Sequence, residues 1–262
     1  MSSSPTTVSP LPSSTDVKAR IKRVVEGTPL EPVARAVWRR LPVGRPLAER
    51  DRDYDRQLEH VMRRVLDPSS SCIDAGAHAG KVLRTIVALA PEGHHLAFEP
   101  LPDCAKLLRD EFPTVDIRQQ ALADTTGVAP FRAVPGNNAG YSGFERRPWD
   151  TYPEQGVEMI EVDVARLDDV VDARTSFRFI KVDVEGGELE LFRGGKELLR
   201  RCRPYIGFEN SSDAREIHRL LVDEVGLRLS LMHRWLAGEP PLTREKFLDE
   251  AGERHYFFLA HP

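Results

Sequence analysis

The sequence has 262 residues, of which 40% are apolar and 30% are charged, with 18 glycines and 20 prolines. This composition is typical of a globular protein and excludes a wholly disordered or fibrous chain. The 37 basic and 41 acidic side chains give a formal net charge of −4. Such a balance provides no positive field to attract nucleic acid or an anionic membrane, so we expect neither as a partner.

The sequence also carries expectations about compartment. No run of about 18 consecutive apolar residues occurs, and the first residues lack the basic and apolar regions of a secretory signal. Cys72, Cys104 and Cys202 are odd in number and widely spaced, which favours reduced thiols over a disulfide framework or a zinc site. We therefore expect a cytoplasmic protein.

The N-terminal part differs in composition from the rest. Residues 1–16 are almost entirely Ser, Thr and Pro, which predicts a disordered tail. Residues 17–66 contain apolar residues at helical spacing, most clearly from Tyr54 to Leu66, and predict an N-terminal helical extension. Residues 67–262 form the expected main domain.

From Ser71 onward, short apolar runs alternate with helical patterns. Strands are predicted at 72–74, 95–99, 115–120, 157–164, 177–184 and 204–209. Helices are predicted at 80–90, 103–112 and 188–201, and again after Asp213, a residue type that caps helices. The last strand-like runs, 228–232 and 255–260, are expected to pair antiparallel at an edge. This order predicts an α/β fold with a doubly wound, mostly parallel sheet and an antiparallel C-terminal edge.

The first motif is a glycine turn, Asp-Ala-Gly-Ala-His-Ala-Gly at residues 74–80. Small residues between a strand and a helix let a ligand approach the backbone. The turn lacks the G-x-G-x-x-G spacing of a dinucleotide fold, and Asp74 at its mouth would repel phosphates. A cationic ligand such as S-adenosylmethionine fits better, with Glu99 at the end of the next strand accepting both ribose hydroxyls. The alternative is a tight turn followed by a strand-end acid that caps a helix.

The second motif is Phe-Ile-Lys-Val-Asp-Val-Glu-Gly-Gly-Glu at residues 179–188. The two-residue period of a strand predicts Lys181, Asp183 and Glu185 on one face. Ligands bind beyond the carboxyl ends of parallel strands, where the next strand adds Glu209. We interpret the carboxylates as functional. The alternative for Lys181 is a salt bridge with Asp183 that only fixes the sheet.

Taken in order over about residues 70–210, these motifs resemble FkbM-type S-adenosylmethionine-dependent O-methyltransferases. The matching elements also include Phe98-Glu99-Pro100, Ala121-Leu-Ala-Asp124 and Arg166-Leu-Asp-Asp169. The resemblance implies a class I methyltransferase (Rossmann-like) fold. It also implies methyl transfer to a hydroxyl of a sugar, an oligosaccharide or a polyketide-type natural product. The N-terminal extension lies outside it, and we expect a role in substrate recognition or in a homo-oligomer contact.

The motifs and the resemblance together name the candidate site residues. The cofactor-binding set is Asp74, Gly76, Ala77, Gly80, Glu99, Gln120, Ala121 and Asp183. Related macrocin-type sugar O-methyltransferases imply Mg²⁺ held by Asp183, Glu209 and Asn210, with Glu185 as the catalytic base and Asp183 also catalytic. This sequence has Asp-Val-Glu and Glu-Asn where that type has paired aspartates. Tyr141 and Phe144, in a long polar loop, are expected to bind the acceptor.

Other hypotheses remain at this point. Five histidines compete with Glu185 for the role of base: His78, His94, His95, His233 and His255. An NAD-dependent oxidoreductase would share the sheet but should carry the third phosphate-binding glycine. A cofactor-binding module without transfer activity is the remaining alternative.

Overall fold

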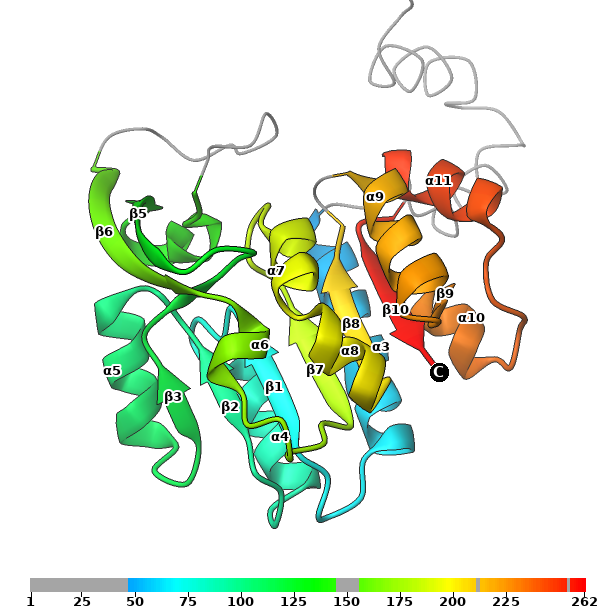
Figure 1. Ribbon diagram of the computed structural model, residues 1–262, viewed down its shortest axis with the longest axis horizontal. Coiled ribbons are helices and arrows are strands. Elements are labelled where there is room, and N and C mark those ends of the chain that lie inside the picture. Colours follow the sequence, from blue (N-terminus) through cyan, green and yellow to red (C-terminus); the bar gives the residue numbers. More distant parts are fainter. Residues whose placement is uncertain (1–46, 145–155, 211–212, 254) are drawn as a thin grey trace, which may run out of the picture. The chain divides into compact units, whose positions relative to one another are not determined.

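The computed structural model describes residues 47–144, 156–210, 213–253 and 255–262 (Figure 1). The predicted tail and the helical pattern from residue 17 to residue 46 lie outside the described residues. The chain divides into two compact units, Met1–Arg50 and Asp51–Pro262. The description that follows concerns the second unit.

A seven-stranded sheet is the centre of the described part of this unit (Figure 1). Its spatial order is β3 (Asp116–Arg118), β2 (Leu96–Phe98), β1 (Cys72–Ala75), β7 (Phe179–Val182), β8 (Tyr205–Glu209), β10 (Phe257–His261) and β9 (Arg228–Ser230). All neighbours are parallel except β10, which is antiparallel to β8 and β9. The predicted α/β class and antiparallel C-terminal edge are confirmed. Strand order reverses between β1 and β7, which is where open α/β sheets bind ligands.

Helices cover both faces of the sheet because strand side chains alternate between them. One face packs against α3 (Leu47–Val65), α4 (Lys81–Leu89), α5 (Pro102–Glu111) and α10 (Met232–Leu236). The other packs against α6 (Leu167–Val170), α7 (Glu188–Gly194), α8 (Lys196–Cys202), α9 (Ala214–His218), a π-helical segment (Arg219–Glu224) and α11 (Arg244–Glu253). In Figure 1, α6, α7 and α8 lie in front of the sheet and α3 lies behind it. The sequence did not predict α10 or α11.

Helix α3 is part of the core of this unit. The apolar stripe that includes Leu58, Val61 and Met62 packs against residues of β1, β7 and β10. A Cβ added to Gly207 of β8 would lie 2.5 Å from Leu58 Cδ1, so the glycine makes room for the helix. The sequence assigned this helix to a separate extension, because periodicity identifies an apolar face but not the surface that covers it.

A second, three-stranded sheet has the order β4 (Ala121–Leu122), β6 (Glu158–Ala165) and β5 (Gly127–Ala133). β4 is parallel and β5 antiparallel to β6. The sequence predicted an extended run at 157–164 but neither a separate sheet nor β5. Gly127 and Pro130 argue against a central strand, yet an edge strand tolerates proline. β5 is such an edge.

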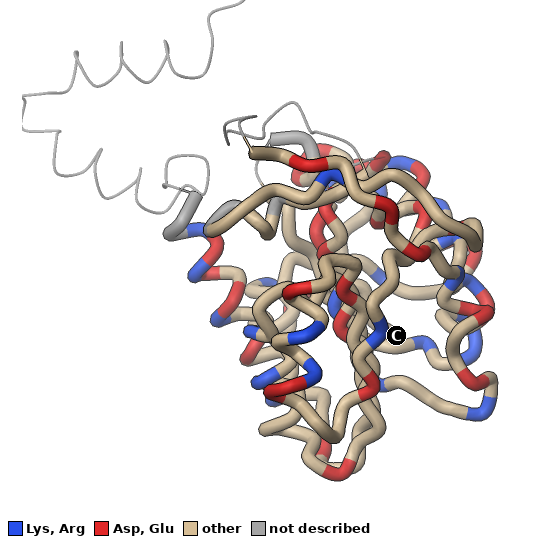
Figure 2. Tube along the Cα trace, turned by 90° about the vertical axis from the view of Figure 1, so that its left-hand side faces the viewer, with Lys and Arg blue, Asp and Glu red and all other residues tan. Residues whose placement is uncertain are grey.

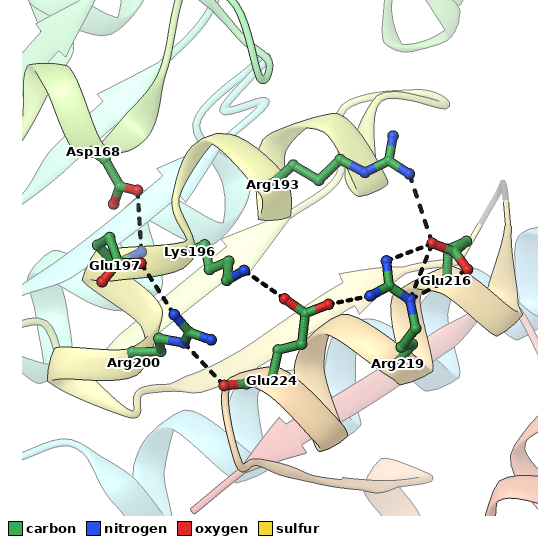
Figure 3. A network of polar contacts seen from close by, with 8 residues as sticks. All are labelled: Asp168, Arg193, Lys196, Glu197, Arg200, Glu216, Arg219 and Glu224. Atoms are coloured by element: carbon green, nitrogen blue, oxygen red, sulfur yellow. Dashed lines mark hydrogen bonds and ion pairs between the residues drawn. The ribbon is translucent and has the colours of Figure 1, made fainter.

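The Leu-Asp-Asp motif has a structural role in the start of α8. Asp168 accepts hydrogen bonds from the backbone N–H groups of Glu197 (3.1 Å) and Leu198 (2.8 Å). Around it lies a network of ion pairs between α7, α8, α9 and the π-helical segment (Figure 3). Its members are Arg193, Lys196, Glu197, Arg200, Glu216, Arg219 and Glu224. Surface pairs of this kind contribute little individually, so the cap is the stronger contact.

Acidic and basic residues are interspersed along the described chain (Figure 2). Within the described residues, no helix combines the length and the apolar character that a membrane span requires.

Candidate active site

A cavity of about 310 Å³ lies where the turns after β1, β2, β3 and β7 meet. Small-molecule sites commonly have volumes of about 300–1,000 Å³. Six of the predicted cofactor-binding residues line it: Gly76, Ala77, Glu99, Gln120, Ala121 and Asp183. Asp74 and Gly80 do not.

The glycine turn brings the loops after β1 and β7 into contact. Gly76 has a φ of 77°, and its N–H donates to the Phe98 carbonyl (3.0 Å). An added Cβ would lie 1.9 Å from the Asp183 carbonyl oxygen, so a side chain here would separate the two loops. Gly80 has a φ of 72°, and its added Cβ would lie 2.8 Å from Phe112 Cε2. Gly80 therefore lets α4 begin against α5.

An ion triad, made of the buried Lys181 and Asp74 and the partly exposed Asp183, holds these loops together. Lys181 pairs with Asp74 across β7 and β1; its Nζ lies 3.6 Å from Asp74 Oδ1 and 3.4 Å from Asp183 Oδ2. It also donates to the Gly76 carbonyl (2.6 Å). Burial raises the pKa of Asp74, against the attraction of Lys181. Burial alone would lower the pKa of Lys181. The attraction of the Asp183 and Asp74 carboxylates is larger, so the net effect is a raised pKa.

The predicted position of Asp74 at the mouth of the turn is therefore wrong. Its side chain is completely buried, because β1 lies between β2 and β7 and the turn begins one residue further on. Asp74 can influence a ligand through Lys181, which does line the cavity. The salt bridge between Lys181 and Asp183, the alternative given for this lysine, is present.

Glu99 is buried at the end of β2 and supports the neighbouring loops. Its Oε2 accepts from the His78 N–H (2.7 Å) and its Oε1 from the Leu101 N–H (3.0 Å). Burial raises the pKa of Glu99, and these two bonds partly oppose that rise. A carboxylate has roughly four acceptor positions, so capacity remains for ligand hydroxyls. Leu101 directly precedes α5, so this bond fixes the entry into the helix without reaching the N–H groups of its first turn.

Three carboxylates converge next to the cavity. Asp183, Glu185 and Glu209 each offer an oxygen atom within 4.8 Å of the other two. β7 ends at Val182, so Asp183 and Glu185 belong to the following turn and not, as predicted, to a strand face. An all-oxygen donor set at this separation fits a hard divalent cation. Asn210 directly follows Glu209 in the sequence, and its buried Oδ1 has no hydrogen-bond partner in the described part of the chain.

Two cavity residues have left-handed backbone conformations. His78 has a φ of 45° and Glu185 a φ of 56°, values that are uncommon for residues with a Cβ and that cluster at functional sites. Burial, followed by the charge of Lys181, lowers the pKa of His78. Among the described histidines, only His78 lines the cavity. His255 instead contacts the Tyr54 hydroxyl through Nδ1 (2.8 Å).

The predicted acceptor loop is described in part. Phe144 lines the cavity, and its ring meets that of Phe131 edge to face with centroids 5.3 Å apart. The backbone of Tyr141 ends a 3₁₀ helix (Gly136–Tyr141). The side chain of Tyr141 and residues 145–155 lie outside what the structure describes.

Two charged lining residues were not named by the sequence. Asp55 of α3 and Lys81 of α4 both face the cavity and form an ion pair. No local pattern could identify Asp55, because its position depends on how α3 packs on the sheet. Lys81 follows the glycine turn directly, which is the signal that could have found it.

Comparisons with known proteins agree with the motifs. The family model described as the methyltransferase FkbM domain matches residues 74–236. A 2-O-methyltransferase, NoeI, of Sinorhizobium fredii (strain NBRC 101917 / NGR234) is 30% identical over 151 residues, covering 52% of this chain and 61% of that protein. The methyltransferase sdnD of Sordaria araneosa is 30% identical over 155 residues, covering 48% and 60%. The match thus spans about three fifths of each relative.

A solved structure of methyltransferase FkbM from Methylobacillus flagellatus KT is also similar. It has a TM-score of 0.49 and 16% identity, over 75% of this chain and 44% of that one. The family match covers more than half of the present chain and contains both motifs. The chain therefore belongs to the FkbM methyltransferase domain family.

Proposed function

We propose that the protein is an S-adenosylmethionine-dependent methyltransferase that acts on a hydroxyl group. The observation that carries the proposal is the cavity within the FkbM domain, lined by residues of both sequence motifs. The name of the relative NoeI, a 2-O-methyltransferase, supports oxygen as the acceptor atom.

The charges of the cavity support S-adenosylmethionine over a dinucleotide. Its lining contains the carboxylates Asp55, Glu99, Asp183 and Glu185 and the ammonium groups Lys81 and Lys181. Four acids against two lysines suit a sulfonium cation better than a pyrophosphate, whose two negative charges would be repelled. Glu99 would accept the ribose hydroxyls with the acceptor positions left by its two backbone bonds.

The carboxylates after β7 supply the base. A hydroxyl needs to lose its proton as the methyl group is transferred, and a positioned carboxylate can accept it. We assign this role to Glu185, since it lines the cavity and the turn at Glu185 and Gly186 directs the chain away from the strand. Lys181 holds the neighbouring Asp183 through a 3.4 Å ion pair.

The same group could hold a divalent cation. Asp183 and Glu209, with Asn210, would be its ligands, and Glu185 is close enough to join them. When bound, Mg²⁺ would lower the pKa of the acceptor hydroxyl. The residues fit such an ion because like charges this close are costly unless they are neutralised.

For the acceptor we propose a sugar, an oligosaccharide or a polyketide-type product. Phe144 and Phe131 give the cavity an aromatic wall, and aromatic side chains bury large apolar surfaces of a ligand. Ala139, Gly140 and Ser142 of the predicted loop also line the cavity, whereas residues 145–155 lie outside the described residues.

The test is product analysis. The full chain is incubated with methyl-deuterated S-adenosylmethionine, Mg²⁺ and a panel of sugars, oligosaccharides and macrolides, and the products are identified by mass spectrometry and NMR. We expect a labelled methyl group on a hydroxyl oxygen, and none with Asp183→Ala. A label found only on nitrogen or carbon would contradict O-methylation.

A further inference from the structure

One wall of the cavity contains an ion pair that joins two helices. Neither of its residues belongs to the two sequence motifs. Asp55 lies on α3, and Lys81 is the first residue of α4. The Lys81 ammonium contacts Asp55 Oδ2, and both residues line the cavity. Their side chains are 68% and 35% exposed, so the pair adds little to stability. Both charges are accessible to a ligand.

The order of the strands in the sheet sets the order of the lining residues along the cavity. Gln120 and Ala121 follow β3, Glu99 follows β2, the glycine turn and Lys81 follow β1, and Asp183 follows β7. These strands are neighbours in the order β3-β2-β1-β7. A ligand whose ribose lies on Glu99, with its base beside Gln120, must extend its remaining chain toward β1 and α4.

In S-adenosylmethionine this remaining chain ends in an amino acid. Its carboxylate and its ammonium are attached to one carbon, so their charges lie close together and have opposite signs. Lys81 and Asp55 form a matching pair of opposite charges on the wall that this end would reach. A charge-assisted hydrogen bond is roughly twice as strong as a neutral one.

We propose that Lys81 binds the carboxylate and Asp55 the ammonium of the cofactor's amino-acid end. This inference rests on the proposed function, since it assumes that the cavity takes S-adenosylmethionine. Asp55 lies outside the family match, which begins at residue 74. Helix α3 is then part of the cofactor site as well as of the core.

Calorimetry on the full chain tests this with two ligands. S-adenosylhomocysteine has the amino-acid end, whereas 5′-methylthioadenosine has the same nucleoside and sulfur without it. We expect Lys81→Met to weaken binding of S-adenosylhomocysteine roughly tenfold, and to leave the affinity for methylthioadenosine within about twofold. Asp55→Asn should act in the same direction and provides the second variant if Lys81→Met does not fold.

A matched control exists on α5. Lys106 forms an exposed ion pair with Asp110, 3.3 Å long, and neither residue lines the cavity. Lys106→Met should therefore leave both affinities unchanged. If methylthioadenosine binds too weakly to titrate, adenosine replaces it as the nucleoside without an amino-acid end.

Two results would overturn the inference. Equal losses for both ligands would mean that the pair only holds α3 against α4. Unchanged affinity for S-adenosylhomocysteine in both variants would mean that the amino-acid end lies elsewhere. Failure of the proposed function is distinct, because the wild-type protein would then bind neither S-adenosylmethionine nor S-adenosylhomocysteine.

Discussion

Replacing Glu99 by alanine should weaken both folding and cofactor binding. The side chain is only 4% exposed, and its two oxygens accept the His78 and Leu101 N–H groups at 2.7 and 3.0 Å. Leaving a buried donor without its acceptor costs about 1–3 kcal/mol. Burial disfavours the charged form of Glu99, as its raised pKa indicates. Removing the carboxylate also removes this free-energy cost, which offsets part of the lost stability. We expect Glu99→Ala to lower the free energy of unfolding by about 2–4 kcal/mol.

The assay is urea unfolding combined with calorimetry under conditions where the variant is folded. Glu99→Gln keeps one acceptor oxygen and should lose about half as much stability. If the remaining acceptor positions bind ribose, Glu99→Ala should also weaken S-adenosylhomocysteine binding roughly 10- to 100-fold. Glu111→Ala removes only a surface partner of Arg84 and serves as the control.

Two results would refute parts of this reasoning. Unchanged stability in Glu99→Ala would contradict the two backbone hydrogen bonds. Reduced stability with an unchanged dissociation constant would leave Glu99 as a helix and loop support, which is the alternative that the sequence already allowed.

Three other predictions follow from the same contacts. Asp183→Ala should abolish metal binding, measured by metal analysis, and turnover, whereas Glu185→Gln should keep the cofactor and lose rate by about 10² to 10⁴. Full activity in excess chelator would contradict a requirement for the metal. Near-normal turnover of Glu185→Gln would contradict Glu185 as the base and make His78 the next candidate. Asp168→Ala removes the cap of α8 and should cost about 0.5–2 kcal/mol in urea unfolding without changing cofactor affinity; a lost affinity would assign it another role. Burial lowers the pKa of His95, so the stability that its neutral form contributes is present above the ordinary value of about 6.5 and is lost as the pH falls below it. His95→Gln should flatten this loss by up to about 1.4 kcal/mol per pH unit, and an identical pH dependence would contradict the assignment.

Much of the main sheet could be predicted because its strands carry local signals. β1, β2 and β7 are short apolar runs next to glycine turns or strand-end acids. At the C-terminal edge, β9 lies within its predicted run and β10 overlaps the run predicted at 255–260. β5 could not be predicted, since Gly127 and Pro130 disfavour a strand until the edge position is known.

The candidate site was predictable where the chemistry is local. The residues after β1, β2 and β7 were found because small residues and carboxylates at strand ends follow from the fold. The burial of Asp74 and the contribution of Asp55 could not be found, because both depend on pairing between segments far apart in the sequence. Lys181 pairs with Asp74 across two strands, and Asp55 lies at the cavity because α3 packs on the sheet, with Leu58 against Gly207.

The most direct test of the central claim is a calorimetric titration of the wild-type full chain with S-adenosylhomocysteine, with NAD⁺ titrated in parallel. The account predicts saturable binding of S-adenosylhomocysteine and no binding of NAD⁺, because the four carboxylates of the cavity suit a ligand without phosphates. Binding of NAD⁺ with no response to S-adenosylhomocysteine or S-adenosylmethionine would contradict it.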